Sequence, residues 1–233
     1  MTYEVEHDNF SSMEIYHVLS RGVDKRTIFK DRHDYLRFIC DLVEFNDNNP
    51  AENIHRIPYK VFDFVSQTKP DTKVKLVNIH AFSLMHNHYH LMLSPAVEGG
   101  ITKFMRKLNI GYAKYFNQKN QRAGALFEGR YKSILISDPV HFLHLPNYIH
   151  LNPLDIYAPE WRRGKIKNYQ QAIGHLKKYK WSSLLDYIGV PNFPMVISKD
   201  LILEVFGSTE YEKQLFGWLK EMNLEYIDDI ILE

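Results

Sequence analysis

The order of the hydrophobic periodicities limits the fold of this chain more than any other feature of its sequence. Apolar residues alternate with polar ones or cluster with β-branched and aromatic residues in four short segments, and they recur at helical spacing in three longer ones. The expected strands are 14–20, 74–85, 88–94 and 131–136, and the expected helices are 31–46, 102–118 and 138–152. This order predicts an α+β fold of the ferredoxin-like split βαβ type, with a four-stranded antiparallel sheet and helices on one face.

Polar residues and prolines mark where the expected helices begin and end. Asp31 and Asp138 precede helical patterns and can act as N-caps, and Pro153 ends the third helix. Pro146 falls inside that helix, where the missing backbone donor predicts a kink or a late start.

The rest of the chain is less regular. Residues 46–72 are expected to form a long loop with a short strand at about 60–65. Beyond residue 155, the sequence WRRGKIK predicts a basic linker, followed by a helical appendage. The helices expected there are 169–178, 182–188, 199–206 and 209–223.

Composition narrows the class of protein. Of the 233 residues, 45% are apolar, which is enough for a core, and no apolar run approaches the roughly 18 residues that span a membrane. The N-terminus lacks the pattern of a signal peptide, and Cys40, the single cysteine, cannot form an internal disulfide. We therefore expect a cytoplasmic protein without a membrane partner.

The net charge of +1 conceals opposed regions. Residues 103–132 and 161–180 are strongly basic, whereas the two ends of the chain are acidic. Aromatic residues are interleaved with the basic ones, a combination typical of single-stranded nucleic-acid binding. The alternative is that the charges form a solvated face and that rings at helical spacing, such as Phe104, Tyr112 and Phe116, belong to the core.

Two histidines in the segment LMHNHYHLML form the sharpest chemical signal. Residues i and i+2 of a strand point to the same face about 7 Å apart, so His88 and His90 project together while Tyr89 points away. Two imidazoles at this spacing can bind one divalent metal if a third ligand comes from elsewhere. The alternative is a pair of exposed or hydrogen-bonded histidines in a chain that has 12 of them.

Four segments in order carry a resemblance to a known family. His88-Tyr89-His90 looks like the His-hydrophobe-His motif of the HUH single-strand nucleases and transposases. The surrounding sequence resembles the REP-associated tyrosine transposases, which are single-tyrosine, insertion-sequence-like transposases, over roughly residues 14–190. The matching segments are FSLMHNHYHLMLSP, KFMRKLNIGYAKYFNQ, GALFEGRYKSILI and YIHLNP.

The resemblance implies a nucleophile and a third metal ligand. The family's nucleophilic tyrosine falls on Tyr148, and its third ligand falls on Asn152. A spacing of four residues places both on one helix face, in agreement with this pairing. The ion implied is Mg²⁺ or Mn²⁺. Without the resemblance, Tyr112 and Tyr115 would be equal candidates for the nucleophile.

The resemblance also implies a reaction, a partner and a division of the chain. It divides the chain into an HUH single-tyrosine transposase domain at 1–155 and a basic linker with a helical appendage at 156–233. The protein is expected to cleave and rejoin single-stranded DNA near hairpins through a 5′-phosphotyrosine intermediate. A homodimer is possible. The phosphate contacts expected are Arg106, Lys107, Arg122, Arg130, Lys132, Arg162, Arg163 and Lys165.

Two other functions remain open. The first is a catalytically silent, domesticated protein that binds single-stranded or hairpin DNA without cutting it. The second is a hydrolase in which His88 and His90 hold Zn²⁺ and a water molecule attacks.

Overall fold

A computed structural model describes residues 14–50, 74–207, 210–221, 229 and 231–232. The short strand expected at 60–65 lies outside these residues.

The centre of the fold is an antiparallel sheet in the order β2-β3-β1-β4. Its strands are β1 (Ile15–Arg21), β2 (Val77–Leu84), β3 (His88–Pro95) and β4 (Lys132–Ile136). β1 and β2 run in the same direction with β3 between them, which is the split βαβ arrangement. The predicted fold class is therefore confirmed.

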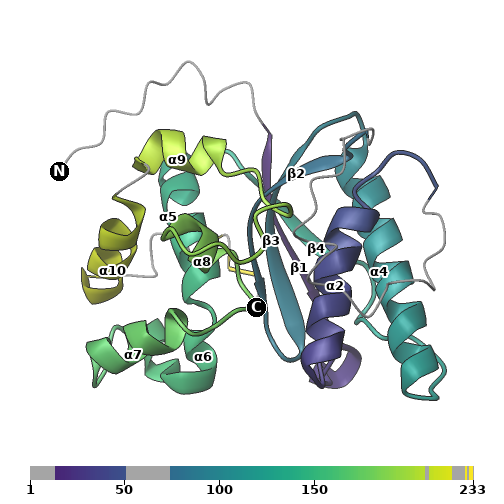
Figure 1. Ribbon diagram of the computed structural model, residues 1–233, viewed down its shortest axis with the longest axis horizontal. Coiled ribbons are helices and arrows are strands. Elements are labelled where there is room, and N and C mark those ends of the chain that lie inside the picture. Colours follow the sequence, from purple (N-terminus) through teal and green to yellow (C-terminus); the bar gives the residue numbers. More distant parts are fainter. Residues whose placement is uncertain (1–13, 51–73, 208–209, 222–228, 230, 233) are drawn as a thin grey trace.

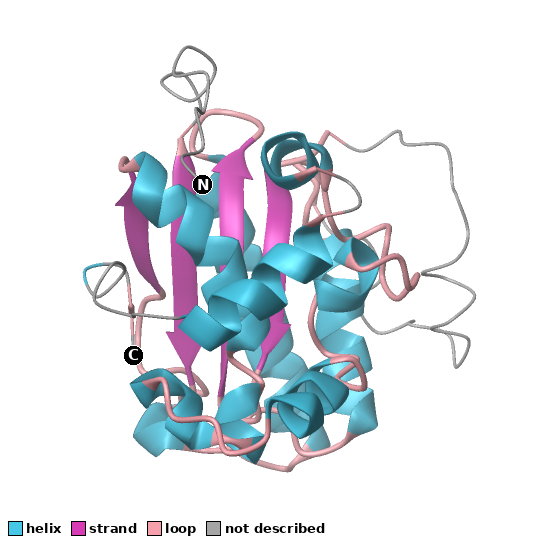
Figure 2. Ribbon diagram, turned by 90° about the vertical axis from the view of Figure 1, so that its left-hand side faces the viewer, coloured by secondary structure: helices cyan, strands magenta, loops and turns pink. Residues whose placement is uncertain are grey.

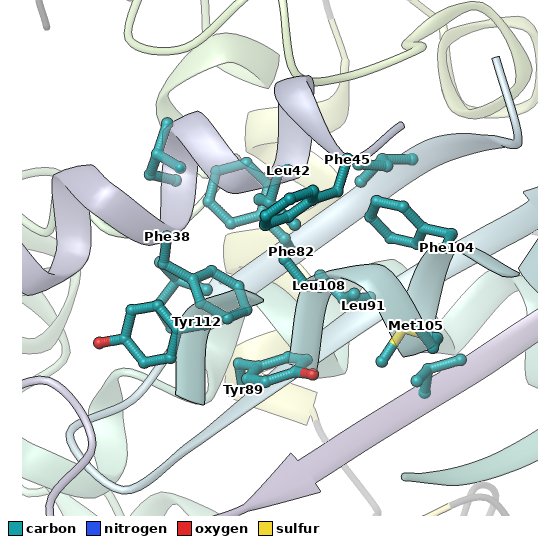
Figure 3. Packing of buried hydrophobic residues seen from close by; sticks show 14 of the residues in the cluster. Phe38, Leu42, Phe45, Phe82, Tyr89, Leu91, Phe104, Met105, Leu108 and Tyr112 are labelled. Carbon is teal, nitrogen blue, oxygen red and sulfur yellow. The ribbon is translucent and has the colours of Figure 1, made fainter. Parts of the chain in front are cut away.

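Two long helices, α2 (Arg32–Glu44) and α4 (Gly100–Lys119), cover one face of the sheet (Figure 1). Asp31 caps α2 by accepting hydrogen bonds from the backbone N–H groups of His33 and Asp34, as its position predicts. Phe38 of α2, Tyr112 of α4 and Tyr89 of β3 belong to the apolar cluster that fills the space between these helices and the sheet (Figure 3). This side of the molecule is a structural core.

The opposite face carries α5 (Pro139–Leu151), which the side chain of Asp138 caps. The helix begins at Pro139 and continues through Pro146, so the proline does not delay its start. Helices on this side cross in front of the strands (Figure 2). The remaining short elements are η1 (Val23–Lys25), α6 (Leu154–Tyr157), η2 (Pro159–Arg163), α7 (Tyr169–Leu176), α8 (Leu184–Tyr187), α9 (Asp200–Phe206) and α10 (Tyr211–Glu221).

The segment beyond residue 155 shares an apolar core with α5. Trp161, Tyr187 and Tyr211 are buried in this second cluster. The expected basic linker is therefore wrong at its start, because residues 159–163 form a 3₁₀ turn around buried Trp161. The boundary at residue 155 stays a prediction. Within the described parts of the chain, no helix is long and apolar enough to cross a membrane.

Candidate active site

The register between β1 and β3 places three histidines on the face that α5 covers. His88 and His90 alternate with Tyr89, whose side chain enters the core under α2 and α4. His17 of β1 lies on the same face as the pair, and a hydrogen bond of 2.9 Å joins its Nε2 atom to Nδ1 of His90.

The hydrogen bonds of the two β3 histidines indicate which ring nitrogens can act as ligands. Nδ1 of His88 lies 2.7 Å from Oδ1 of Asn87, and the amide nitrogen of Asn87 donates to the carbonyl of Lys25. Because Oδ1 can only accept, His88 carries its proton on Nδ1, and the lone pair of the neutral ring is on Nε2. The His17 contact allows the same tautomer in His90, whose ring centroid is 5.1 Å from that of His88.

Tyr148 and Asn152 approach the histidines from the C-terminal half of α5. The Tyr148 ring meets His90 edge to face at 5.7 Å between centroids, and it meets His17 at 6.0 Å. Asn152 caps the helix, and its amide nitrogen donates to the carbonyl of Tyr148 at 3.0 Å. This bond assigns the amide nitrogen to the helix backbone and leaves Oδ1 of Asn152 as the acceptor of the side chain.

Arg162 links the tyrosine and the asparagine. Its guanidinium donates to the Tyr148 hydroxyl at 3.2 Å and to Oδ1 of Asn152 at 2.9 Å. Asp155 holds the same group through hydrogen bonds of 2.8 and 2.6 Å, and it also accepts one from the indole of Trp161 at 2.6 Å. The guanidinium also lies over the rings of Tyr148 and Trp161. The 3₁₀ turn η2 therefore holds the Arg162 guanidinium against Tyr148 and Asn152.

A buried histidine anchors the helix that carries the tyrosine. His150 is fully buried, with Nδ1 2.6 Å from the Tyr211 hydroxyl and Nε2 2.7 Å from Oγ of Ser183. Burial lowers the pKa of His150 to about 3, so the ring is neutral at physiological pH. These bonds fix α5 to α8 and α10, and so they also fix the position of Tyr148.

The donor set fits a divalent ion only if the asparagine takes part. Among the described residues, no group of three or more His, Cys, Asp and Glu side chains is arranged to hold a metal. Two imidazole nitrogens and the amide oxygen of Asn152 would suit Mg²⁺ or Mn²⁺, and the oriented Asn152 amide and the His88 tautomer agree with that role.

The predicted phosphate contacts do not gather in one place. Arg106, Arg130, Lys132, Arg163 and Lys165 are exposed. Lys107 donates to the carbonyls of Asp47 and Asn49, and Arg122 donates to Asn117 and Ala125 in its own loop. Because α4 covers the face opposite to Tyr148, Arg106 and Lys107 lie on the far side of the sheet from the site.

Most of the aromatic residues near the basic stretches belong to the core. Phe104, Tyr112, Phe116, Phe127 and Trp161 are all buried. Tyr115 is partly buried, and its hydroxyl donates to the carboxylate of Asp34. These rings therefore form no exposed stacking platform, which supports the alternative drawn from helical spacing.

Sequence reasoning missed two members of the site. His17 alternates in β1 as His90 does in β3, but only the register shows that they meet. Asp155 lies two residues after Pro153, and its partner Arg162 is seven residues further on, across a turn that no pattern predicts.

A comparison with protein families agrees with the motif resemblance. Residues 57–152, which include all four predicted catalytic and metal-binding residues, match the family model described as transposase IS200 like. Among solved structures, the chain is similar to one described as a REP-associated tyrosine transposase bound to a REP hairpin, with a TM-score of 0.42 and 12% identity. That similarity covers 86% of this chain and 93% of the other. No curated protein matches the sequence.

Proposed function

We propose that the protein is a DNA strand transferase that cuts and rejoins single-stranded DNA near hairpins, because residues 57–152 match the family model described as transposase IS200 like. The observation that carries the proposal is the contact between the Tyr148 ring of α5 and the His90 ring of β3, whose centroids are 5.7 Å apart. His88 lies beside His90, and Asn152 follows Tyr148 one helical turn later.

The Tyr148 oxygen is the proposed nucleophile. A bond forms between this oxygen and the phosphorus of a phosphodiester, and the bond from phosphorus to the 3′ oxygen breaks. The phenol gives up its proton, and the leaving strand ends as a 3′-OH. Attack by another 3′-OH on the phosphotyrosine reverses these steps and joins strands, so the number of phosphoester bonds is conserved and no energy source is needed.

The chain's own groups hold the reactants. Nε2 of His88, Nε2 of His90 and Oδ1 of Asn152 would bind Mg²⁺ or Mn²⁺, which when bound polarises the scissile phosphate. Asn87 and His17 orient the two imidazoles through their Nδ1 atoms. Arg162 fixes the phenol oxygen, because its bonds to Asp155 restrict the guanidinium.

Covalent trapping tests the proposal. The full-length protein is incubated with Mn²⁺ and labelled single-stranded DNA from the flanks of its own gene, and adducts are separated by denaturing electrophoresis. We expect an adduct that disappears in Tyr148→Phe and persists in Tyr157→Phe, a matched control at an exposed tyrosine. An adduct that survives Tyr148→Phe would place the nucleophile elsewhere. Cleavage that leaves a free 5′-phosphate independently of Tyr148 would identify a hydrolase.

One observation favours a second candidate, DNA binding without cleavage. Tyr148, His90 and Asn152 have no exposed surface, and Arg162 already occupies the hydroxyl of Tyr148 and the amide oxygen of Asn152. Hairpin binding in the absence of any adduct would select this candidate. A homodimer stays a prediction, which sedimentation of the protein with and without DNA would test.

A further inference from the structure

A second arginine, Arg21, lies next to the histidine pair. In the register of β1 and β3, Arg21 is directly opposite His88, and Leu19 is opposite His90. Residues that face each other across an antiparallel pair have their side chains on the same face, with Cβ atoms about 5 Å apart. Arg21 therefore projects beside His88, on the face of the sheet that holds Tyr148.

The side chain of Arg21 is only partly exposed. Its Nε atom is buried, and no described residue accepts a hydrogen bond from it. In the neighbouring segment, the N–H of Glu128 donates to the Arg21 carbonyl at 2.9 Å. The Glu128 side chain is exposed, and within the described residues Arg21 has no ion pair. A buried cationic donor without a partner is costly, so the position favours an anionic ligand.

We propose that Arg21 is a catalytic residue that binds the non-bridging oxygens of the scissile phosphate. This inference rests on the proposed function, because it assigns a substrate contact to the same site. The Nε edge of a guanidinium presents two parallel donors that match two phosphate oxygens. A phosphate seated between His88 and Tyr148 would reach that edge. Negative charge that accumulates on the phosphate oxygens in the transition state would be stabilised there.

Rates of adduct formation give the first test. Arg21→Gln, Arg21→Lys and, as a control at an exposed arginine of α2, Arg32→Gln are compared with Mn²⁺ at saturating flanking DNA. We expect Arg21→Gln to slow the adduct about 100-fold, the order found when one oxyanion donor is removed. Arg21→Lys should recover part of the rate because it restores the charge without the paired donors, and Arg32→Gln should stay near wild type. An Arg21→Gln rate equal to that of Arg32→Gln would overturn the proposal.

A scan with neutral phosphates gives a test that does not require cleavage. Single methylphosphonates are placed along the same oligonucleotide, and affinities are measured for the wild type and for Arg21→Gln. At the phosphate that Arg21 contacts, the loss of affinity seen with the wild type should vanish in the variant. Where the wild type forms an adduct, this phosphate should also be the one that is cut. Coupling only at another phosphate, or at none, would overturn the assignment.

The two tests separate the failure of this inference from that of the proposed function. If the wild type forms no adduct, strand transfer fails, and the scan alone decides whether Arg21 contacts a phosphate. Thermal unfolding checks that each variant is folded. Should Arg21→Gln fail to fold, Arg21→Lys carries both tests, since it keeps the charge and loses the paired geometry.

Discussion

Asp155→Asn probes whether the ion pair with Arg162 organises the candidate site. The change keeps the shape of the side chain and removes the charge that receives two hydrogen bonds from the guanidinium. The side chains of Arg162 and Asp155 are only 23% and 24% exposed, so solvent screens them less than a surface pair. After the cost of desolvation, we expect a loss of about 1–2 kcal/mol in the free energy of unfolding. Because Asp155 holds the Arg162 guanidinium that donates to the Tyr148 hydroxyl, adduct formation should also slow, by about tenfold if some 1.4 kcal/mol of positioning is lost.

A double-mutant cycle measures this effect. Urea unfolding of Asp155→Asn, Arg162→Gln and the double variant should give a coupling energy of about 1–2 kcal/mol. Glu212→Gln, which breaks the more exposed pair with Lys177, serves as the control and should cost under about 0.5 kcal/mol. Additive effects of the two site variants would refute the ion pair. A strong coupling combined with an unchanged adduct rate would instead refute the positioning of Tyr148 by Arg162.

Three further predictions concern metal, pH and DNA. His17→Phe should weaken Mn²⁺ binding by about 10- to 100-fold, as measured by calorimetry, because His90 loses the group that orients it; unchanged affinity would exclude that role. Burial lowers the pKa of His80 to about 4, so its contribution to stability is full above pH 6.5 and is lost as the pH falls towards 4. The loss is about 2 kcal/mol at pH 5, and urea unfolding of His80→Gln should lack this part of the pH dependence. Lys165→Gln should reduce the slope of log affinity against log salt by about 1 for any DNA sequence, whereas Arg122→Gln should change it less because its guanidinium is already bonded within its loop.

The main framework of the fold could be predicted because each of its elements has a local signal. Alternation marks β3, an aspartate caps α2, and a second aspartate caps α5. Pro146 gave the wrong expectation of a late start, because Asp138 and the proline at the first helical position fix the beginning of α5 seven residues earlier. A proline inside a helix removes one donor, and burial of α5 against the sheet keeps the rest of the helix in place.

The environment of the candidate residues was harder to predict than their identity. The motifs point to His88, His90, Tyr148 and Asn152, and in the structure the His90 ring contacts those of His88 and Tyr148. The motifs contain no information on the 3₁₀ turn η2, because this turn forms around Trp161, which is buried in a core built from segments far apart in the sequence. The basic residues that follow Trp161 suggest an exposed linker, yet burial of the indole brings Arg162 onto Tyr148. Local charge patterns fail here because a tertiary contact determines which cation is exposed.

His17 and Arg21 could not be predicted as site residues, because the sequence does not specify the register between β1 and β3. Alternation along β1 already places His17, Leu19 and Arg21 on one face, but it does not say which residue of β3 each one meets. A shift of two residues would keep each side chain on the same face of the sheet, but it would move Arg21 away from His88. The ladder between β1 and β3 continues past the end of β1, where the N–H of Gly22 donates to the carbonyl of Asn87 in the turn that precedes His88. Residues that no motif marks therefore reach the candidate site through the pairing of two strands that are far apart in the sequence.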